Sequence, residues 1–500
     1  MLNDFYKQFK SGTDIRGVAT EGVAGQSVNL TDDVIKKMAD GFTLWLSKKV
    51  NKAPSELKIA VGRDSRVSGP HIMELTTGRF CAAGAEVLRC GLASTPSMFM
   101  TTVDLGCDGA LQITASHHPF NRNGLKFFTR EGGLEGSDIE AILEYAQNDE
   151  RPELKDGGSI TDCDYMTDYA KGLCDKIKRE VNADDYDHPL KGFHIVVDAG
   201  NGAGGFYADK VLAVLGADTT GSRYLDPDGM FPNHVPNPED AVAMASICEA
   251  VRENNADLGV IFDTDVDRGG AVDSKGNEIN RNRLVAVAAA IALEGNDGGT
   301  IVTDSITSAG LKEFIEKDLG GRHYRYRRGY KNVIDKALEL NAQGINCPLA
   351  IETSGHAAMR ENYFLDDGAY LCTKIIIKAA QLRKQGKDLS DLTAALKEPL
   401  ESREVRFKIT EKDFRACGER IIADLTAYAE KESGWQLADD NREGVRVSFD
   451  KANGDGWFLL RLSVHDPIMP LNIESDSAGG VDVIYKKLME FLKTTKGLEI

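Results

Sequence analysis

Short apolar runs alternate with helix-like stretches along most of the chain, and this pattern restricts the fold more than any other feature. The runs have the length of strands and end in glycine or a polar loop; they cover residues 57–61, 85–88, 193–197, 258–262 and 300–302. Between them lie stretches typical of helices, such as 31–48, which opens with an N-cap threonine and two first-turn aspartates. Strands separated by helices indicate βαβ units and a mixed or parallel sheet.

The chain is too long for a single unit of this kind. Five hundred residues predict several domains of about 100–200 residues each. The pattern changes after about residue 400, where apolar runs at 405–409, 445–449 and 457–462 surround an Asp-Gly turn. We therefore expect a smaller α+β domain at the C-terminal end. Polar stretches near 150–160 and 383–391 are interpreted as linkers.

Composition argues against several classes of partner and location. The chain carries 60 Lys and Arg against 78 Asp and Glu, a net charge of −18. It lacks the basic field that nucleic acids require, and anionic membranes would repel it. The longest apolar run, 284–293, is too short to span a membrane and is interpreted as a buried helix. The 9 cysteines include no CxxC pair, and no signal peptide is evident, so we expect buried thiols in a reducing cytoplasm.

A serine loop follows the apolar residues 110–113. It reads Thr-Ala-Ser116-His117-His118-Pro, and Asn-Gly-Leu-Lys126 follows shortly after it. The Gly-x-Ser-x-Gly elbow of α/β-hydrolases is absent, so the serine is not a nucleophile of that type. Taken alone, the Ser-His pair is equally compatible with a polar loop whose side chains cap the neighbouring backbone.

A second loop places Asp263, Asp265 and Asp267 directly after a strongly apolar run. In an extended segment, alternate side chains share one face, so the three carboxylates would converge. Three like charges at close range need a cation among them, and hard oxygen ligands suit Mg²⁺. An EF-hand is excluded because Arg268 occupies the turn-glycine position and Ser274 the place of the final glutamate. The loop therefore predicts a magnesium site.

Three further segments carry groups suited to a phosphorylated sugar. Glu352-Thr-Ser354-Gly-His356 offers groups that hold vicinal hydroxyls, although a structural turn explains it equally well. Residues 325–331 contain four cations and no acid, which indicates either a local anion site or a salt-bridged surface. Arg461 and Ser463 follow a predicted strand and form a plausible phosphate cradle. No Walker sequence is present, and the glycines at 200–204 lack dinucleotide-binding spacing.

In this order, the serine, triple-aspartate, sugar and phosphate loops resemble those of the α-D-phosphohexomutases, the phosphoglucomutase/phosphomannomutase group. Asp14-Ile-Arg16-Gly, Gly-Arg-Asp64-Ser-Arg66 and the segment 228–238 also match, so the resemblance extends from residue 14 to about 474. It implies four domains around a central cleft: three related mixed-sheet α/β units and a C-terminal α+β domain. The expected domain boundaries are 1–155, 156–277, 278–392 and 393–500.

The resemblance also implies roles for individual residues. Ser116 would be a phosphoserine, and one Mg²⁺ would bind to Asp263, Asp265, Asp267 and a phosphoryl oxygen on Ser116. Arg268 would stabilise the transferring phosphoryl group. The acid/base candidates are Lys126, His117 and His356, with Arg16 nearby. The substrate-binding residues would be Gly329, Lys331, Glu352, Ser354, His356, Arg461, Ser463 and His465.

The activity implied is interconversion of hexose 1-phosphate and hexose 6-phosphate, with mannose, glucose or both, through a bound 1,6-bisphosphate that also acts as activator. An amino-sugar phosphate mutase and a Mg²⁺-dependent sugar phosphatase remain alternatives. Small sugar phosphates are the expected partners, without nucleic acid, membrane or an obligatory protein. Three residues depart from the family pattern: His118 stands where asparagine is usual, and Val464 and His465 alter the phosphate loop.

Overall fold

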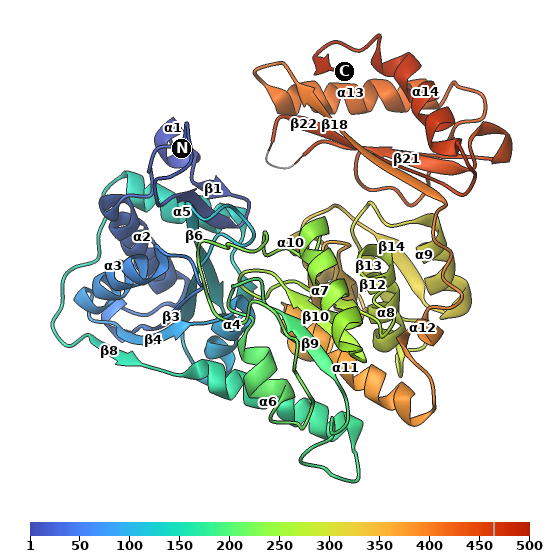
Figure 1. Ribbon diagram of the computed structural model, residues 1–500. Helices are drawn as coiled ribbons and strands as arrows, with labels where there is room; N and C mark the ends of the chain where they lie inside the picture. The colour runs from blue at the N-terminus through green and yellow to red at the C-terminus, as the bar shows by residue number, and fades with distance from the viewer. Residues whose placement is uncertain (464–465) are drawn as a thin grey trace. The chain divides into compact units, whose positions relative to one another are not determined.

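The computed structural model describes residues 1–463 and 466–500. The chain divides into two compact units (Figure 1). The first contains Met1–Leu284 and Ser354–Leu392, and the second contains Val285–Thr353 and Thr393–Ile500. Each unit therefore contains two segments that are distant in the sequence.

The N-terminal part of the first unit is an eight-stranded mixed sheet in the order β1-β2-β6-β5-β3-β4-β8, with β7 paired to β6. Strands β3, β4, β5 and β8 run parallel, β6 runs antiparallel to β5, and β2 runs antiparallel to β6. The strands are β1 (Lys10–Ser11), β2 (Asp14–Val18), β3 (Lys58–Arg63), β4 (Glu86–Leu92), β5 (Gly109–Ile113), β6 (Arg122–Thr129), β7 (Gly132–Gly133) and β8 (Ser159–Asp162). The helices are α1 (Asp4–Lys7), α2 (Asp32–Val50), α3 (Gly69–Ala82), α4 (Thr95–Asp104) and α5 (Gly136–Gln147).

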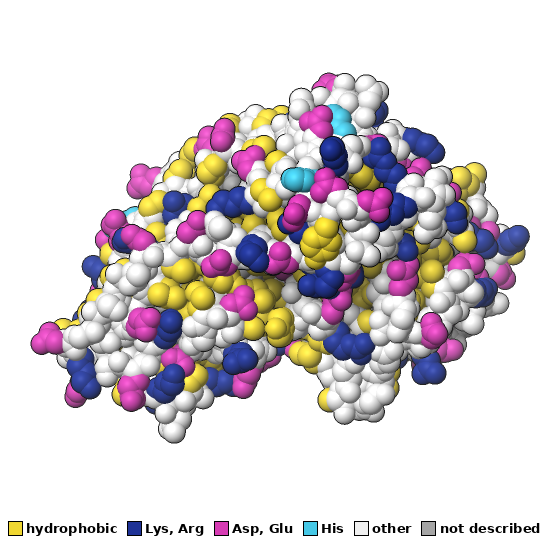
Figure 2. Space-filling view, turned by 90° about the horizontal axis from the view of Figure 1, so that it is seen from below, with side chains coloured by type: hydrophobic (Ala, Val, Ile, Leu, Met, Phe, Trp, Pro, Cys, Tyr) yellow, Lys and Arg dark blue, Asp and Glu magenta, His cyan; other side chains and the backbone are white. Residues whose placement is uncertain are grey.

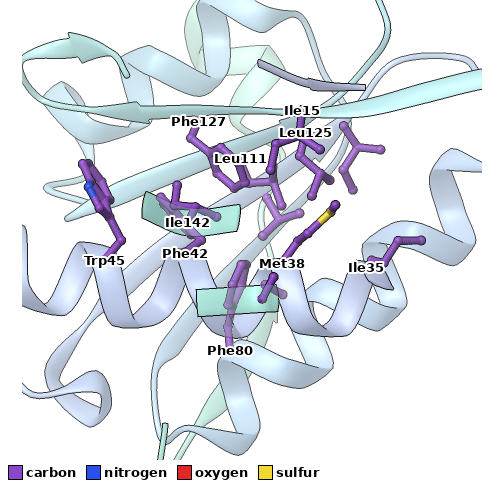
Figure 3. Packing of buried hydrophobic residues seen from close by; sticks show 14 of the residues in the cluster. Ile15, Ile35, Met38, Phe42, Trp45, Phe80, Leu111, Leu125, Phe127 and Ile142 are labelled. Atoms are coloured by element: carbon purple, nitrogen blue, oxygen red, sulfur yellow. The ribbon is translucent and has the colours of Figure 1, made fainter. Parts of the chain in front are cut away.

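A hydrophobic core between this sheet and its helices fixes the sheet's position (Figure 3). Phe42 of α2 stacks on Phe127 of β6, with ring centroids 4.4 Å apart. Met38, Phe80 and Ile142 come from three different helices and are all completely buried in the same cluster. Full burial of such side chains contributes about 1.5–3 kcal/mol each. The core thus provides a rigid base for the loops at the carboxyl ends of β3, β4 and β5.

The rest of the first unit surrounds a four-stranded sheet in the order β12-β11-β10-β9. Strand β10 runs parallel to β9 and antiparallel to β11, so the chain reverses direction immediately after β10. The strands are β9 (Ile195–Asp198), β10 (Leu258–Phe262), β11 (Gly269–Val272) and β12 (Glu278–Ile279), with the hairpin β16 (Ala357–Met359) and β17 (Leu365–Asp366). The helices are α6 (Tyr165–Val181), η2 (Tyr207–Leu212), α7 (Ala241–Asn254), α11 (Gly368–Lys384) and α12 (Leu389–Leu392).

The second unit contains a parallel group of strands and a separate antiparallel sheet. Strand β13 (Thr300–Thr303) runs parallel to both β14 (Arg322–Arg325) and β15 (Leu349–Ile351). Nearby helices are α8 (Arg281–Leu293), which begins in the first unit, α9 (Ala309–Glu313) with η3 (Phe314–Asp318), and α10 (Tyr330–Ala342). The C-terminal sheet has the order β19-β20-β21-β22-β18-β23. Its elements are β18 (Glu401–Ile409), α13 (Phe414–Ala429), β19 (Gln436–Leu437), β20 (Val445–Phe449), β21 (Gly456–Leu460), β22 (Ile468–Ser475), α14 (Gly480–Leu492) and β23 (Leu498–Glu499).

The predicted fold class is confirmed: α/β sheets occupy the chain up to about residue 392, and a separate α+β sheet follows. Strands β10 and β20 have the predicted limits. The expected linker at 150–160 overlaps β8, because Ser159–Asp162 pairs with β4 as an edge strand. The four domain boundaries stay a prediction.

One expectation from composition has a structural counterpart. Helix α8 contains the apolar run 284–293, most of which is completely buried. Within the described residues, no helix is long and apolar enough to cross a membrane. Acidic and basic side chains are interspersed over the face shown in Figure 2, so the negative charge does not gather there in one patch.

Candidate active site

The serine loop and the triple-aspartate loop meet inside the first unit. The Ser116 hydroxyl donates to Asp263 Oδ2 at 3.3 Å, although the two residues lie at the ends of different sheets. Ser116 is 3% exposed, and none of the three aspartates is more than 1% exposed. The structure therefore brings together the two loops that the sequence singled out, in a site shielded from solvent.

The aspartate loop is a tight turn between the antiparallel strands β10 and β11. Carboxylate oxygens of Asp263, Asp265 and Asp267 lie within 4.8 Å of one another. Val266, between the last two, has a φ of 67°, which is strained for a β-branched residue. The predicted convergence is confirmed, but its predicted cause is wrong. The turn directs the side chains to one point, whereas we expected alternation along an extended segment.

Each carboxylate has its own neighbour. Lys126 Nζ donates to Asp267 Oδ2 at 2.7 Å, the hydroxyl of Thr95 donates to Asp265 Oδ2, and the backbone N–H of Arg268 donates to Asp263 Oδ1 at 3.2 Å. Among the residues that the structure describes, none donates a hydrogen bond to the buried atoms Asp265 Oδ1 and Asp267 Oδ1. Buried polar atoms left in this way are rare in proteins, and a bound ion is one explanation for them. Two carboxylate oxygens beside a third carboxylate fit a divalent cation such as Mg²⁺.

The charges in this cluster are unevenly balanced. Burial and the neighbouring carboxylates raise the pKa of Asp263 well above its ordinary value and that of Asp265 to about 6. Burial would also raise the pKa of Asp267, but the charges of Lys126, His356 and Arg268 outweigh it, so this pKa is lowered. These cationic side chains thus compensate mainly one carboxylate, that of Asp267, and the other two favour either protons or a metal ion.

One guanidinium group holds the serine loop in shape. Arg66 Nη1 donates to the carbonyls of Pro119 and Arg122 at 2.7 and 2.9 Å, and its Nη2 donates to the carbonyls of Ser116 and His118. Ser116 has a φ of 50°, an uncommon backbone conformation for a residue other than glycine. The loop therefore wraps around a single side chain, which itself is completely buried.

Asp64 completes this arrangement. Its Oδ2 pairs with Arg66 Nε at 3.2 Å and accepts from the Thr114 hydroxyl at 2.7 Å. The Thr114 hydroxyl oxygen in turn accepts from the backbone N–H of Ser116 at 2.9 Å. Sequence reasoning noted the Gly-Arg-Asp-Ser-Arg segment but gave it no role. A buried arginine has no local pattern that distinguishes it from a surface arginine.

A glycine allows a second loop to pack on this segment. A Cβ added to Gly229 would lie 2.5 Å from Ser65 O and from Val67 N, so any larger residue would push the two loops apart. Two positions further on, the ring of Phe231 lies 5.2 Å from the Arg66 guanidinium. Residues 228–231 therefore support the arginine that shapes the serine loop.

Histidines surround the serine. The Ser116 hydroxyl lies 3.2 Å from His117 Nδ1. Burial and nearby cations lower the pKa of His117 to about 2 and that of His118 to about 3, so both imidazoles are neutral near pH 7. A neutral imidazole next to a hydroxyl can accept a hydrogen bond from it, although so low a pKa makes it a weak base.

His356 connects Arg268 to a further acid. Arg268 Nε donates to His356 Nε2 at 2.8 Å, and His356 Nδ1 is hydrogen-bonded to Asp366 Oδ2. Both ring nitrogens are thus engaged, which orients the arginine beside the aspartate loop. Sequence reasoning missed Asp366, although it follows an apolar pair in the way that the predicted loops do.

Two predicted residues of the first unit carry atoms suited to a ligand. Within residues 1–463 and 466–500, no hydrogen-bond partner reaches the buried atoms Arg16 Nε and Ser354 Oγ. Arg16 lies opposite Gly124 in the β2–β6 pairing and also forms an ion pair with Asp14 at 3.0 Å. The Arg16 side chain is close enough to lower the pKa of both neighbouring histidines.

The remaining predicted residues belong to the second unit. Glu352 Oε1 accepts from the backbone N–H of Gly329 at 2.6 Å, and Lys331 pairs with Asp335. In the described part of the chain, the largely buried Arg461 Nε has no hydrogen-bond partner. Ser463 Oγ accepts from the backbone N–H of Asp466 at 3.3 Å. His465, and with it Val464, lies outside the described residues.

One part of the cationic segment has a structural function. Arg325 is 4% exposed, pairs with Asp440 at 2.7 Å and donates to Thr307 and to the Ser308 carbonyl. Arg325 is therefore not available to an anion site, because it is buried and the carboxylate of Asp440 already compensates its charge. For the other cations of 325–331, the anion site stays a prediction.

Comparison with known proteins gives the chain a family. Residues 8–153, 169–276 and 280–399 match the models of Phosphoglucomutase/phosphomannomutase, alpha/beta/alpha domains I, II and III. The chain belongs to the phosphoglucomutase/phosphomannomutase family. The resemblance drawn from the motifs is thereby confirmed, and so is the prediction of a phosphotransferase of the mutase type.

Relatives match along nearly the whole chain. A phosphoglucomutase of Neisseria meningitidis is 28% identical over 499 residues, which cover 100% of this chain and 98% of the relative. A phosphomannomutase/phosphoglucomutase of Pseudomonas syringae is 29% identical over 445 residues, 88% of each chain. The crystal structure of a phosphoglucomutase/phosphomannomutase family protein from Burkholderia thailandensis gives a TM-score of 0.79 at 26% identity, covering 99% of this chain and 98% of that one.

Substitution Arg66→Lys should loosen the serine loop, because a single ammonium group cannot reach the four carbonyls that the guanidinium holds. Hydrogen bonds from charged donors contribute about 1.5–3 kcal/mol each, so amide hydrogen exchange in residues 116–122 should accelerate about tenfold or more. Exchange in β10 should be unchanged. The matched control is Arg89→Lys in β4, next to the edge strand β8. Equal exchange rates in both variants would contradict the role of Arg66.

Proposed function

We propose that this chain interconverts hexose 1-phosphate and hexose 6-phosphate, with mannose, glucose or both as the sugar. The reaction would run through a phosphoserine at Ser116 and a bound hexose 1,6-bisphosphate, which also serves as activator. The observation that carries the proposal is the contact between the Ser116 hydroxyl and Asp263, in a buried site that also contains two cationic side chains. Family membership supports the same reaction class.

Asp263, Asp265 and Asp267 would hold one Mg²⁺ together with a phosphoryl oxygen on Ser116. When bound, this ion supplies positive charge to a phosphoryl group during its transfer. The proposal is supported by the two buried carboxylate oxygens that, within the described chain, accept no hydrogen bond. It is also supported by the raised pKa values of Asp263 and Asp265.

The other side chains would provide charge and proton transfer. Phosphoryl transfer depends mainly on positioning and on stabilisation of negative charge. Arg268, oriented by His356, would stabilise the transferring group, with Arg16 close to the same histidines. Lys126 would keep its proton through its contact with Asp267. His117 would be an acid/base candidate whose lowered pKa makes it a weak base. His356 stays an acid/base candidate only if its contact with Arg268 is exchanged for one with substrate.

Sugar recognition would have to tolerate two opposite orientations. After the first transfer, the bisphosphate must turn over so that its other phosphate returns to Ser116. Glu352 and Ser354 would hold the ring hydroxyls that are common to both orientations. Arg461, Ser463 and His465, with Gly329 and Lys331, would hold the phosphate that is not reacting. The unpartnered Nε of Arg461 in the described chain supports this assignment.

Phosphorus-31 NMR separates this proposal from its alternatives. Enzyme with Mg²⁺ and a trace of the bisphosphate is incubated with glucose 1-phosphate, mannose 1-phosphate or N-acetylglucosamine phosphate. The hexose 6-phosphate resonance should grow from the first, the second or both. If only the N-acetylglucosamine phosphate is converted to its isomer, the enzyme is an amino-sugar mutase. Release of inorganic phosphate at the rate of substrate loss would indicate a phosphatase and refute the proposal.

Substitution Ser116→Ala should abolish turnover, because the hydroxyl that carries the phosphoryl group is lost. Removal of a covalent nucleophile typically lowers kcat at least about 1,000-fold. Intact-protein mass spectrometry should show phosphorylation by the bisphosphate in the wild type and none in this variant. The exposed Ser137→Ala, in the same sheet domain, is the control. Full activity of Ser116→Ala would show that another group carries the phosphoryl.

Substitution Asp265→Asn should weaken Mg²⁺ binding, because it removes one of three carboxylate ligands. We expect an increase in Kd of at least about tenfold by calorimetric titration, since even indirect disturbance of a metal site costs that much. Mg²⁺ should also raise the melting temperature of the wild type far more than that of the variant. Asp297→Asn, on an exposed loop, should behave like wild type. Equal Mg²⁺ affinities in all three proteins would show that the cation does not bind to this loop.

Substitution Arg461→Ala should raise KM far more than Ser463→Ala does. The arginine offers a planar charged fork to a phosphate, whereas the serine contributes one neutral hydroxyl that already accepts from Asp466 N. Charged hydrogen bonds are roughly twice as strong as neutral ones. Steady-state kinetics on the preferred hexose phosphate measures both variants. Equal KM values would show that phosphate binding does not depend on the guanidinium.

A further inference from the structure

Two thiols lie side by side at the outer edge of the eight-stranded sheet. Cys90 belongs to β4, and Cys163 directly follows β8, the edge strand that pairs with β4 in parallel. Arg89 stands opposite Asp162 in this pairing, and the Cys163 N–H donates to the Arg89 carbonyl at 3.0 Å. The next pair of positions along the two strands is therefore Cys90 and Cys163.

This placement suits a disulfide. Neighbouring strands lie about 4.8 Å apart, and disulfides join residues whose Cα atoms are about 4.4–6.8 Å apart. The two thiols interact directly enough that Cys163 is the strongest influence, after burial, in raising the pKa of Cys90. Both are free thiols in this structure, Cys90 buried and Cys163 partly exposed. All four residues of β8 are exposed, so reagents in solution reach the Cys163 side of the pair.

We propose that Cys90 and Cys163 form a redox-modification site that a low-molecular-weight disulfide, such as oxidised glutathione, converts to an intrachain disulfide. The Cys163 thiol loses its proton to solvent, and its thiolate attacks one sulfur of the glutathione disulfide. One glutathione thiolate leaves and takes up a proton. The Cys90 thiol then loses its proton, and its thiolate attacks the Cys163 sulfur. The second glutathione leaves as a thiolate and takes up a proton. Two protein thiols are oxidised by two electrons, and one glutathione disulfide is reduced to two thiols.

The order of these steps follows from the environment of each thiol. Burial and the nearby thiols of Cys163 and Cys107 raise the pKa of Cys90, so this residue is a poor first nucleophile. Cys163 is the accessible member of the pair and reacts first. The mixed disulfide then lies next to Cys90, where the second step is intramolecular and the local thiol concentration compensates for its low thiolate fraction.

The modification would act on the aspartate loop through β4. Five residues after Cys90, Thr95 donates its backbone N–H to Asp265 O at 2.8 Å and its hydroxyl to Asp265 Oδ2. A sulfur–sulfur bond is shorter than a contact between thiols, so its formation draws the end of β4 toward residue 163 and disturbs Thr95. Disturbance of a partner that orients a metal ligand costs about 10–100-fold in affinity or activity. This consequence, unlike the disulfide itself, rests on the proposed function.

Thiol counting and peptide mapping test the disulfide without reference to activity. The full-length enzyme is equilibrated in glutathione buffers of increasing oxidised fraction and trapped with an alkylating reagent. We expect the 9 titratable thiols to fall by two and peptide mapping to join Cys90 to Cys163. Cys163→Ser should prevent the link, whereas Cys107→Ser and the control Cys81→Ser should retain it. An unchanged thiol count, a stable glutathione adduct on Cys163 alone, or a Cys90–Cys107 link would overturn the proposal.

Kinetics on the same samples test the coupling to Thr95. Oxidised wild type should turn over about tenfold more slowly than reduced enzyme and recover with dithiothreitol. Cys163→Ser should match reduced wild type and resist oxidation. A mapped disulfide with unchanged turnover would overturn the coupling. If the reduced enzyme shows no mutase activity at all, the proposed function fails while the mapping result still decides whether the disulfide forms.

Discussion

Three carboxylates buried in one turn impose the constraint on which the rest of the first unit depends. The oxygens of Asp263, Asp265 and Asp267 lie within 4.8 Å of one another and are almost inaccessible to water. Full ionisation of such a cluster is costly without compensating charge. Lys126 compensates only one carboxylate, so the turn retains a strong preference for a further cation. The chain must therefore hold in place a geometry that its own charges disfavour.

Contacts from distant segments supply the force that holds this turn. The backbone N–H of Gly368 donates to Val266 O at 3.0 Å, and Gly269 N donates to Gly355 O at 3.2 Å. A Cβ on Gly368 would lie 2.3 Å from the carbonyl carbon of Arg268, so only glycine permits this approach. The positive φ of Val266 persists because these neighbours over-determine it. Contacts from distant segments, rather than local sequence preference, thus stabilise the strained backbone of this turn.

The serine loop also has an uncommon backbone conformation, which a buried ion pair holds in place. Four of its carbonyl groups converge on Arg66, and Asp64 balances the arginine's charge while holding Thr114. A buried ion pair of this kind contributes less to net stability than to a unique loop geometry, because desolvation of both charges offsets much of their attraction. In the first unit, two loops with uncommon backbone conformations therefore meet at one hydroxyl group.

Local sequence patterns were enough to predict the alternating α/β architecture and the separate C-terminal sheet, and to single out the serine and aspartate loops. These follow from local information, because hydrophobic periodicity and turn residues act over a few positions. The folded chain was needed to reveal the contacts of Arg66, Thr95 and Asp366, the burial of Arg325, and the neighbouring positions of Cys90 and Cys163. Thr95 and Asp265, for example, are 170 residues apart. Such partners leave no pattern along the chain, since their contact exists only after folding brings the start of α4 next to the turn after β10.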